Sequence, residues 1–530
     1  MKKILVTVFL LTTTLFSIWA GGRRQTPAAP AGGGKPELSV WTSWDFGDDK
    51  RMVHWQEAEK RTGIHINFSS NKSDSNEALN LMIASGDLPD ILGVFFSPEQ
   101  YLMMAEGGTI IPIENYIDGT DSNYKKGLAE YPEYRKFITA PNGHIYSFPY
   151  ADSSVQTMPA PMKMWVRSDW LKKLNISMPN TTEELRAMLR AFKDRDPNGN
   201  GRKDEMGLLG YNPFWDFSDP IMFLMAPFQL YHDNFHVISG SGQVQFVADT
   251  DGWREGLRYI NSLYREGLVE PVSWVHDMDQ AKTLVSKPAS DAVAGAFVGR
   301  YVYSVVGPPA NWTDFEAVPP LRGPTGLRQT AALNEARFRQ HNAITTACKN
   351  PELAFKWLDW WLTDEANMFS LWGAEGIHYD LVDQESFYGT KPAVKLRPNI
   401  GVPPDDLLAI MDTGLIPRFD KASIRYAGVN DPSTRNVDES YMDLEAAKRY
   451  EPYYVWHNIP QIVWCTDTDL VNRKNDYQTN FNSYVNTEAL AFITGEKDIN
   501  SNAAWNAYKQ GLLNLGLNDY LAVLKKYYGL

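Results

Sequence analysis

Oxygen-bearing side chains are concentrated between Asp196 and Glu205, where the sequence reads Asp-Pro-Asn-Gly-Asn-Gly-Arg-Lys-Asp-Glu. Two glycines lie within this run, and glycine allows the positive φ angles that a tight loop needs. Because Ca²⁺ takes roughly six to eight oxygen ligands from carboxylates, amides and backbone carbonyls, the run is typical of a calcium-binding loop. An ordinary polar turn, which uses the same residue types, is the alternative interpretation.

Two registers of calcium ligands are compatible with this loop. One register starts at Asp194, turns at Gly199 and closes on Glu205, following the pattern D-x-[DN]-x-[DN]-G-x5-E. The other register uses Asp196, Asn198, Asn200, the backbone carbonyl of Arg202, Asp204 and Glu205. No helix of matched length follows the loop, so we expect a structural Ca²⁺ ion rather than a calcium-dependent switch.

Motifs of common catalytic centres are missing from the sequence. It contains no G-x-S-x-G, H-E-x-x-H, C-x-x-C or G-x-x-x-x-G-K-[ST] pattern, and its histidines are scattered. Glycoside hydrolysis needs only two carboxylates across a cleft, so a secreted carbohydrate-active enzyme stays open as an alternative.

The amino terminus predicts export from the cytoplasm. Two lysines precede an apolar run from Ile4 to Trp19, which is too short to span a membrane and is typical of a signal peptide comprising residues 1–20. Residues 21–35 are rich in Gly, Pro and Ala and predict a flexible leader. No cysteine for a lipid anchor follows Ala20, so we expect a periplasmic or secreted protein.

The composition limits the partners and the size of the fold. The chain has 530 residues, enough for two or three domains with large cores. Its 64 acidic side chains outnumber the 51 basic ones, which argues against nucleic acid and anionic membranes as partners. Cys348 and Cys465 are the two cysteines, and the sequence leaves open whether they form a disulfide.

The elements that would position these residues indicate an α/β protein. Residues 37–41, 64–68 and 90–96 read as strands, and helical patterns lie between them. Strands separated by helices predict parallel pairing through crossovers. A further helix is expected at 182–192, where Thr181-Thr-Glu-Glu184 has the chemistry of a capping box.

Segments along most of the chain resemble a known family. They are Glu59–Gly63, Ala84–Asp90, Pro141–Pro149, Met164–Leu208, and Pro351–Trp357 together with Trp372–Tyr379. In this order they resemble extracellular solute-binding proteins of ABC-type sugar importers, in the large subgroup of alginate-binding and lipoprotein-A-like proteins.

The resemblance implies two mainly parallel α/β lobes, flanked by helices and joined by a hinge, with the ligand held in the cleft between them. We place lobe 1 at residues 36–150 plus 310–385 and lobe 2 at 151–309 plus 386–530. The family's calcium loop maps onto the register that starts at Asp196, and it is a structural site away from the ligand. The implied protein is a monomer that delivers an oligosaccharide to an ABC permease in the membrane.

Aromatic and charged residues near strand ends are candidates for the ligand site. The 17 Trp and 26 Tyr side chains provide more flat aromatic surface than core packing usually requires. Aromatic rings stack on the apolar faces of sugars, and charged groups bond the hydroxyls. We predict ligand contacts from Trp41, Trp44, Asp45, Phe95, Phe96, Tyr150, Trp165, Trp274, Arg300, Trp372 and Trp464.

The nature of the solute is not determined by these features. Aromatic richness favours a sugar, and a protein of the same fold that binds a peptide or another solute is the alternative. A uronate ligand would require a local basic cluster, for which Arg51, Lys163 and Arg300 are candidates.

Overall fold

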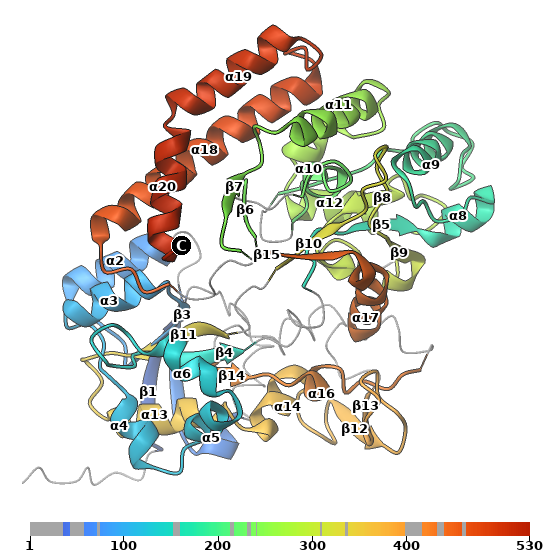
Figure 1. Cartoon of the computed structure of the whole chain (residues 1–530). Helices are drawn as coiled ribbons and strands as arrows, with labels where there is room; N and C mark the ends of the chain where they lie inside the picture. The colour runs from blue at the N-terminus through green and yellow to red at the C-terminus, as the bar shows by residue number, and fades with distance from the viewer. Residues whose placement is uncertain are drawn as a thin grey trace, which may run out of the picture.

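The computed structural model describes residues 35–42, 58–70, 75–151, 159–212, 217–230, 235–239, 241–307, 310–333, 338–397, 416–431, 439–457 and 463–530. The predicted signal peptide, the predicted leader up to residue 34, and Trp44, Asp45 and Arg51 lie outside these ranges. The described elements form two bodies, with the C-terminal helices along one side of the upper body (Figure 1). The predicted two-lobed α/β fold is confirmed.

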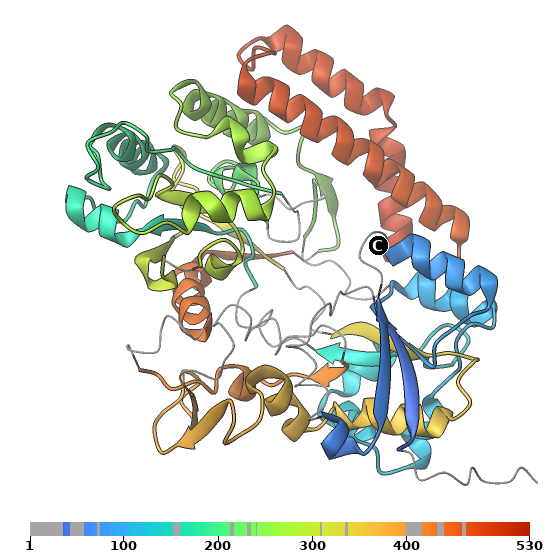
Figure 2. The same cartoon turned by 180° about the vertical axis from the view of Figure 1, so that it is seen from behind.

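The first lobe, the lower body in Figure 1, is built on a six-stranded sheet with the order β14-β4-β11-β3-β1-β2. Its strands are β1 (Glu37–Thr42), β2 (His65–Ser70), β3 (Ile91–Phe95), β4 (Phe148–Ala151), β11 (Phe338–Ile344) and β14 (Arg418–Phe419). Strand β1 pairs in parallel with β2 and β3, as the sequence predicts, whereas β11 runs antiparallel to β3 and β4. The view from behind shows β1 and β2 at one side of this lobe (Figure 2).

Helices flank this sheet. They are α2 (Ser75–Ser85), α3 (Pro98–Glu106), α4 (Glu114–Gly119), α5 (Asn123–Glu130), α6 (Pro132–Ile138), α13 (Pro351–Trp360) and α14 (Asp364–Trp372). A small extension adds β12 (Tyr379–Val382), β13 (Ala393–Leu396) and α16 (Ala422–Arg425). Trp372 and Tyr379 belong to a separate small apolar cluster in this extension.

The second lobe contains a three-stranded antiparallel sheet with the order β8-β5-β9, so the prediction of a mainly parallel sheet is wrong for this lobe. Its strands are β5 (Met164–Arg167), β8 (Ala296–Val298) and β9 (Phe315–Val318), and β6 (His236–Ile238) and β7 (Val244–Phe246) form a hairpin. The helices are α8 (Ser168–Leu174), α9 (Thr182–Asp194), α10 (Pro220–Leu224), α11 (Asp251–Arg265), α12 (Met278–Val285), α17 (Glu439–Tyr450), α18 (Thr468–Thr494), α19 (Asn502–Asn514) and α20 (Leu517–Tyr528). Short 3-10 helices are η2 (Pro271–Trp274), η3 (Val302–Ser304), η4 (Trp312–Asp314) and η6 (Glu451–Tyr453).

Helix α9 begins where its capping chemistry predicts. The Thr181 hydroxyl accepts a hydrogen bond from the Glu184 backbone N–H, and the Glu184 carboxylate accepts one from the Thr181 N–H. The capping box therefore satisfies two donors that the first turn of a helix leaves unpaired. This helix leads directly into the predicted calcium loop.

A parallel pair of strands links the two lobes. Strand β10 (Thr330–Leu333) pairs with β15 (Tyr454–His457), and we call this pair the hinge ribbon. The residue Ala331 belongs to the core of the second lobe, and Ala343, which follows β10 along the chain, belongs to an apolar cluster of the first. The ribbon therefore marks a place where the chain crosses between lobes.

The apolar clusters group the chain differently from the predicted lobe segments at two places. Phe315 and Leu321 pack in the large core of the second lobe, whereas Phe419 packs in the core of the first. Crossings between the cores consequently lie near residues 151–160, 331–343 and 419–442, and on either side of Trp464, between Tyr454 and Tyr477.

The two cysteines do not form a disulfide in this structure. Cys348 is buried and Cys465 is half-buried. Within the described ranges, none of the helices combines the length and apolar character needed to cross a bilayer.

We predict that Gly127→Ala destabilises the first lobe. A Cβ atom on Gly127, in α5, would lie 2.0 Å from Cε2 of Phe419, which is buried in β14. Overpacking of this kind costs about 1–3 kcal/mol, and we expect that loss in the free energy of unfolding measured with urea. Gly119→Ala is the matched control because a Cβ at that position meets no atom within 4 Å. Equal stabilities of the two variants would contradict the close packing of α5 on β14.

Candidate ligand-binding site

Aromatic and basic side chains form a row along one edge of the first-lobe sheet. Strands β3, β4 and β14 end at this edge, and the antiparallel strand β11 begins there. Strand pairing places Phe95 of β3 opposite His341 of β11. It places Tyr150 of β4 between Arg339 of β11 and Arg418 of β14. We call these five residues the edge row. In Figure 1 these four strands lie along the side of the first lobe that is nearest to the second. Ligands of open α/β sheets bind beyond the carboxyl ends of strands, so the row has the position of a ligand site.

The side chains of the edge row contact one another. The Phe95 ring meets the Tyr150 ring edge-on at 4.9 Å between centroids and the His341 ring at 4.3 Å. The guanidinium of Arg418 lies 4.2 Å from the centroid of Tyr150 and donates a hydrogen bond to its hydroxyl. Arg339 lies 5.8 Å from the centroid of Phe95. The row therefore combines aromatic surface with guanidinium donors, which is the chemistry that a sugar requires.

Burial divides the edge row into supporting and accessible members. Tyr150, His341 and Arg418 are buried, whereas Phe95 is half-buried and Arg339 is exposed. The buried members hold the geometry of the row, and Arg339 and Phe95 present its surface. The sequence predicted Phe95 and Tyr150 but not the other three residues.

Basic and aromatic residues also gather at one end of the second-lobe sheet. Lys163 precedes β5 and Arg300 follows β8, and the antiparallel pairing of these strands brings the two residues together. The Lys163 ammonium donates a hydrogen bond of 3.1 Å to the Arg300 carbonyl. The Arg300 guanidinium lies 5.0 Å from the centroid of Tyr301, which stacks on Tyr303 at 4.9 Å. This end of the sheet is where the chain enters from the first lobe, so the predicted residue Arg300 lies on the side of the lobe crossing.

Trp274, another predicted ligand residue, is held by a carboxylate. It is half-buried, and its indole N–H donates a hydrogen bond of 3.2 Å to Asp219. The same carboxylate accepts a bond of 2.8 Å from the Ile221 N–H and so caps α10. Burial raises the pKa of Asp219 to about 6, although both hydrogen bonds act in the opposite direction.

The hinge ribbon carries an aromatic residue that the sequence-based prediction missed. Trp456 in β15 is 50% exposed, whereas every other tryptophan in the described ranges is buried or half-buried. Its ring lies 6.0 Å from that of Tyr454 in the same strand. The strand reads Tyr-Val-Trp-His and has no alternation of apolar and polar residues that would signal exposure.

The remaining predicted aromatic residues are largely enclosed by other side chains. Trp41, Phe96, Trp165 and Trp372 are buried, and Trp464 is half-buried. The indole N–H groups of three of them donate to backbone carbonyls, Trp165 to Gly299, Trp372 to Ile424 and Trp464 to Phe137. The structure does not bring these five residues into the edge row, and their contact with a ligand stays a prediction.

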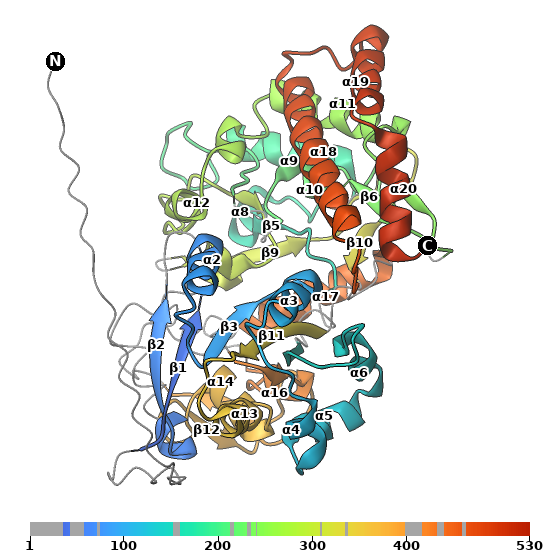
Figure 3. The same ribbon diagram turned by 90° about the vertical axis from the view of Figure 1, so that its left-hand side faces the viewer.

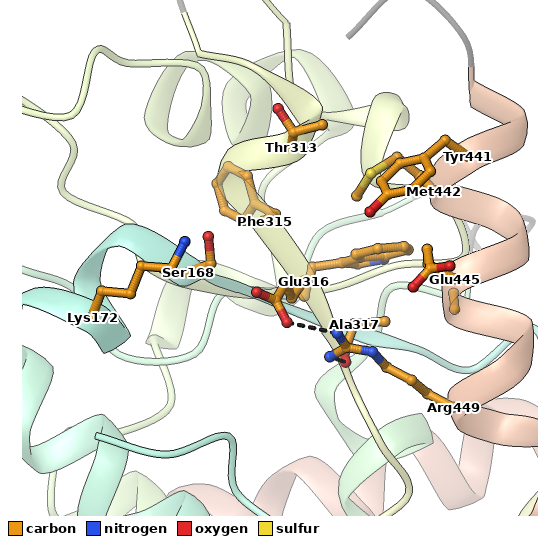
Figure 4. A pocket seen from close by; sticks show the side chains of 12 residues that line it. Ser168, Lys172, Thr313, Phe315, Glu316, Ala317, Tyr441, Met442, Glu445 and Arg449 are labelled. Carbon is orange, nitrogen blue, oxygen red and sulfur yellow. Dashed lines mark hydrogen bonds and ion pairs between the residues drawn. The ribbon is translucent and has the colours of Figure 1, made fainter. Parts of the chain in front are cut away.

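A cavity of about 320 Å³ lies within the second lobe, beside the edge strand β9 (Figure 4). It is lined by Trp165, Ser168, Lys172, Thr313, Phe315, Glu316, Ala317, Tyr441, Met442, Glu445, Ala446 and Arg449. Arg449 in α17 pairs with Glu316 at 2.6 Å and also donates to the Ala317 carbonyl. Since all of its lining belongs to one lobe, this cavity is separate from the row at the crossing.

The predicted calcium loop has the backbone of a tight turn. Asp196, Gly199 and Gly201 adopt positive φ angles of 46°, 78° and 75°. The Asp196 carboxylate accepts hydrogen bonds from the backbone N–H groups of Gly199, Asn200 and Gly201. The Asn198 side-chain oxygen accepts one from Asn200, so the oxygens of these side chains turn into the loop.

Acidic side chains close the loop. The Asp204 carboxylate accepts hydrogen bonds from the Asn200 amide, which lower its pKa, and pairs with the Arg202 guanidinium at 3.0 Å. The described ranges hold no group of three or more His, Cys, Asp or Glu side chains arranged for a metal. The predicted register combines three carboxylates with two asparagine amides and one backbone carbonyl. Whether these residues suit a Ca²⁺ ion therefore depends on the surroundings of the individual carboxylates.

The carboxylate of Glu205 is the most informative of these groups. Its residue is 5% exposed, and both carboxylate oxygens are buried without a hydrogen-bond partner among the described residues. Burial raises the pKa of Glu205, and the neighbouring charges of Asp196 and Asp204 raise it further. A buried carboxylate without a partner is costly, and a cation would offset that cost. The residues of the loop therefore fit a Ca²⁺ ion.

The chain is similar to known proteins over most of its length. Residues 48–368 match the family of bacterial extracellular solute-binding proteins. The chain is 33% identical over 509 residues to the fructooligosaccharide ABC transporter substrate-binding protein FusA of Streptococcus pneumoniae serotype 4 (strain ATCC BAA-334 / TIGR4). That alignment covers 91% of this chain and 87% of FusA.

Solved structures of the Streptococcus pneumoniae protein FusA share the fold. The complex of FusA with kestose has a TM-score of 0.76 at 31% identity, and the comparison covers 93% of this chain and 99% of that chain. An EF-hand mutant of FusA in complex with fructo-nystose has a TM-score of 0.77 at 30% identity with the same coverage.

Asp219 is expected to make stability depend on pH. Because its pKa is raised to about 6 in the folded state, the folded protein binds a proton more tightly than the unfolded chain between about pH 4 and 6. The free energy of unfolding therefore falls as pH rises through this window. Asp219→Asn should remove this effect, so the variant should gain about 1–3 kcal/mol relative to wild type between pH 4 and 7.5.

Urea unfolding at several pH values measures this difference. Asp383→Asn is the control, because the Asp383 side chain is 96% exposed. Parallel pH profiles of wild type and Asp219→Asn would contradict the raised pKa.

Proposed function

The chain belongs to the family of bacterial extracellular solute-binding proteins, and we propose that it captures an oligosaccharide between its two lobes and delivers it to an ABC permease. The observation that carries the proposal is the edge row, which places aromatic rings and guanidinium groups at the lobe crossing. The similarity to FusA, which binds fructooligosaccharides, supports the same class of ligand.

Capture would use contacts from three places. The edge row supplies Phe95 and Arg339 from the first lobe, Arg300 and Tyr301 face the crossing from the second, and Trp456 lies on the ribbon between them. Aromatic rings stack on the apolar faces of sugar rings, while guanidinium groups donate hydrogen bonds to hydroxyls. A ligand that contacts both lobes favours the arrangement in which they are close together, so binding shifts the population toward closure.

Fructooligosaccharides such as kestose and nystose are the first ligands to test. Several cationic groups lie at the crossing, including the adjacent Lys163 and Arg300, which the sequence analysis considered for a uronate ligand. A uronic oligosaccharide is therefore the second ligand class. The relatives are binding proteins, and we propose that this chain releases its sugar intact.

The receptor would act outside the cytoplasm. The family is extracellular, and the proposed signal peptide at residues 1–20 supports export of this chain. The proposed form is a monomer that presents the sugar-bound state to its permease.

We propose a structural Ca²⁺ ion in the loop that follows α9. The ligands would be Asp196, Asn198, Asn200, the carbonyl of Arg202, Asp204 and Glu205. The buried carboxylate of Glu205 supports the proposal, as does the existence of an EF-hand mutant of FusA. The ion would supply positive charge to these carboxylates and hold the loop closed. The loop is distant in sequence from the edge row, which is consistent with a structural role rather than a role in ligand binding.

Arg339→Ala should weaken sugar binding without loss of stability. Arg339 is exposed and reaches over Phe95, so its removal deletes a donor from the surface of the edge row. Calorimetric titration with kestose or nystose should show an affinity about tenfold lower than that of wild type. Arg190→Ala is the matched control, because the Arg190 side chain is 54% exposed on α9.

The outcomes separate the possible functions. A thermal shift of wild type with an intact sugar supports the receptor. A shift followed by cleavage products in mass spectrometry would assign an enzyme instead. If peptides and no neutral or uronic sugar shift the melting temperature, the ligand class is wrong, and the fold serves another solute.

Removal of Ca²⁺ should lower the melting temperature. A ligand that binds only the folded state stabilises it by mass action, so excess chelator is expected to reduce Tm by about 2–5 °C. Glu205→Gln should abolish this response, since it removes the buried charge that the ion would neutralise. Asp383→Asn should respond like wild type. A chelator-insensitive Tm, together with metal-free purified protein, would show that the loop is an ordinary turn.

A further inference from the structure

A second connection between the lobes lies far from the edge row in sequence. Helices α18 and α20 belong to the second lobe, because Phe481 and Leu524 pack in its core. The helix α3 belongs to the first lobe, because Tyr101 packs in an apolar cluster with Leu92 of the first-lobe sheet. Figures 1 and 3 show α18 and α20 next to α3.

This connection is made by polar groups. The Tyr527 hydroxyl in α20 donates a hydrogen bond of 2.6 Å to the Glu99 carboxylate in α3. The Lys474 ammonium in α18 lies 4.5 Å from the centroid of the Tyr527 ring. Burial lowers the pKa of Lys474 and raises that of Tyr527, which places both groups in a partly desolvated environment. We call Glu99, Lys474 and Tyr527 the joint.

The joint is braced on both sides. On the second-lobe side, Lys526 pairs at 2.9 Å with Asp467, and Asp467 caps the first turn of α18. On the first-lobe side, Trp464 donates a hydrogen bond of 2.6 Å to the Phe137 carbonyl, three residues before that cap. The segment that leads into α18 is therefore held to the first lobe beside the joint, and α20 is held to the start of α18.

The contact between α3 and α18 is otherwise loosely packed. A cavity of about 480 Å³ separates the two helices, and Leu102, Met103 and Val471 are among the residues that line it. Packed apolar surfaces resist small displacements, whereas a polar contact beside a cavity lets two helices tilt without a clash. The joint can therefore hold its hydrogen bond while α3 changes its angle to α18.

Besides the chain crossings, the hinge ribbon and the joint are two connections that hydrogen bonds hold in place. A rigid motion that preserves both the hinge ribbon and the joint is a rotation about the line through them. We propose that the joint is a pivot of lobe closure, and that Tyr527 is a positioning residue for ligand capture. This inference rests on the proposed capture of a ligand between the lobes, and it adds the direction in which the lobes move.

Distances between spin labels test the pivot directly. In a Cys465→Ser background, one label pair would span the joint, at Glu106 in α3 and Lys525 in α20, which are both exposed. A second pair would span the opposite side, at Asn80 in α2 and Asp279 in α12, two exposed residues on helices that Figure 3 shows across the molecule from α20. With kestose or nystose, we expect the opposite-side distance to shorten while the distance across the joint stays unchanged.

Two results would overturn the proposal, one in the sugar-bound protein and one in the ligand-free protein. A joint distance that changes as much as the opposite-side distance would show that the contact opens during closure. If no sugar binds, the proposed function fails, and the pivot is judged from the ligand-free protein. There it requires a narrower distance distribution across the joint than across the opposite side, and equal widths would contradict it.

Tyr527→Phe tests the hydrogen bond itself. Loss of the bond to Glu99 should broaden the distance distribution across the joint, because the lobes gain other modes of motion. The less organised free state should bind sugar about three- to tenfold more weakly. Tyr388→Phe is the matched control, since Tyr388 is 53% exposed in the extension of the first lobe. An unchanged affinity and distribution in Tyr527→Phe would remove Tyr527 from this role.

Discussion

Separate apolar cores in the two lobes are the constraint on which the rest of the structure depends. The core of the second lobe and the clusters of the first share no buried residue. Each core is completed by segments distant in sequence, as Phe419 completes the first and Phe481 the second. A lobe that is packed on its own can move as a rigid body, because only the crossings and the polar contacts between lobes have to change.

The edge row shows how a site can be rigid at the boundary of such a core. Arg418 and His341 are buried, yet both face aromatic rings of the row rather than the apolar interior alone. Their positions are set by strand pairing, since β4 and β14 align Tyr150 with Arg418. Side chains that are held before a ligand arrives lose less conformational freedom on binding. The buried members thus support the accessible surface of Phe95 and Arg339.

Local patterns in the sequence predicted the first strands, the capping box at Thr181 and the ligand candidates Phe95 and Tyr150, which end their strands. Arg339 and Arg418 could not be found in this way, because their proximity to Tyr150 depends on pairing between strands nearly 200 and 270 residues apart in sequence. Trp165, at the start of an expected strand, and Trp372, in an expected loop, were predicted as ligand contacts too, but tertiary packing encloses them. Aromatic type and a strand end identify candidates, and only the fold decides which of them are accessible.

Trp456 would connect the proposed site to the proposed motion of the lobes. When one lobe rotates relative to the other, residues near the rotation axis move least. The hinge ribbon lies on the proposed axis, so it would move less relative to either lobe than residues far from the axis. A sugar stacked on Trp456 would therefore keep this contact in the open and the closed arrangement. Contacts from Arg339 on one lobe and Arg300 on the other would be complete only in the closed one. Closure would then be driven by the contacts that the second lobe adds to a ligand already held, which is the differential affinity that a shift of population requires.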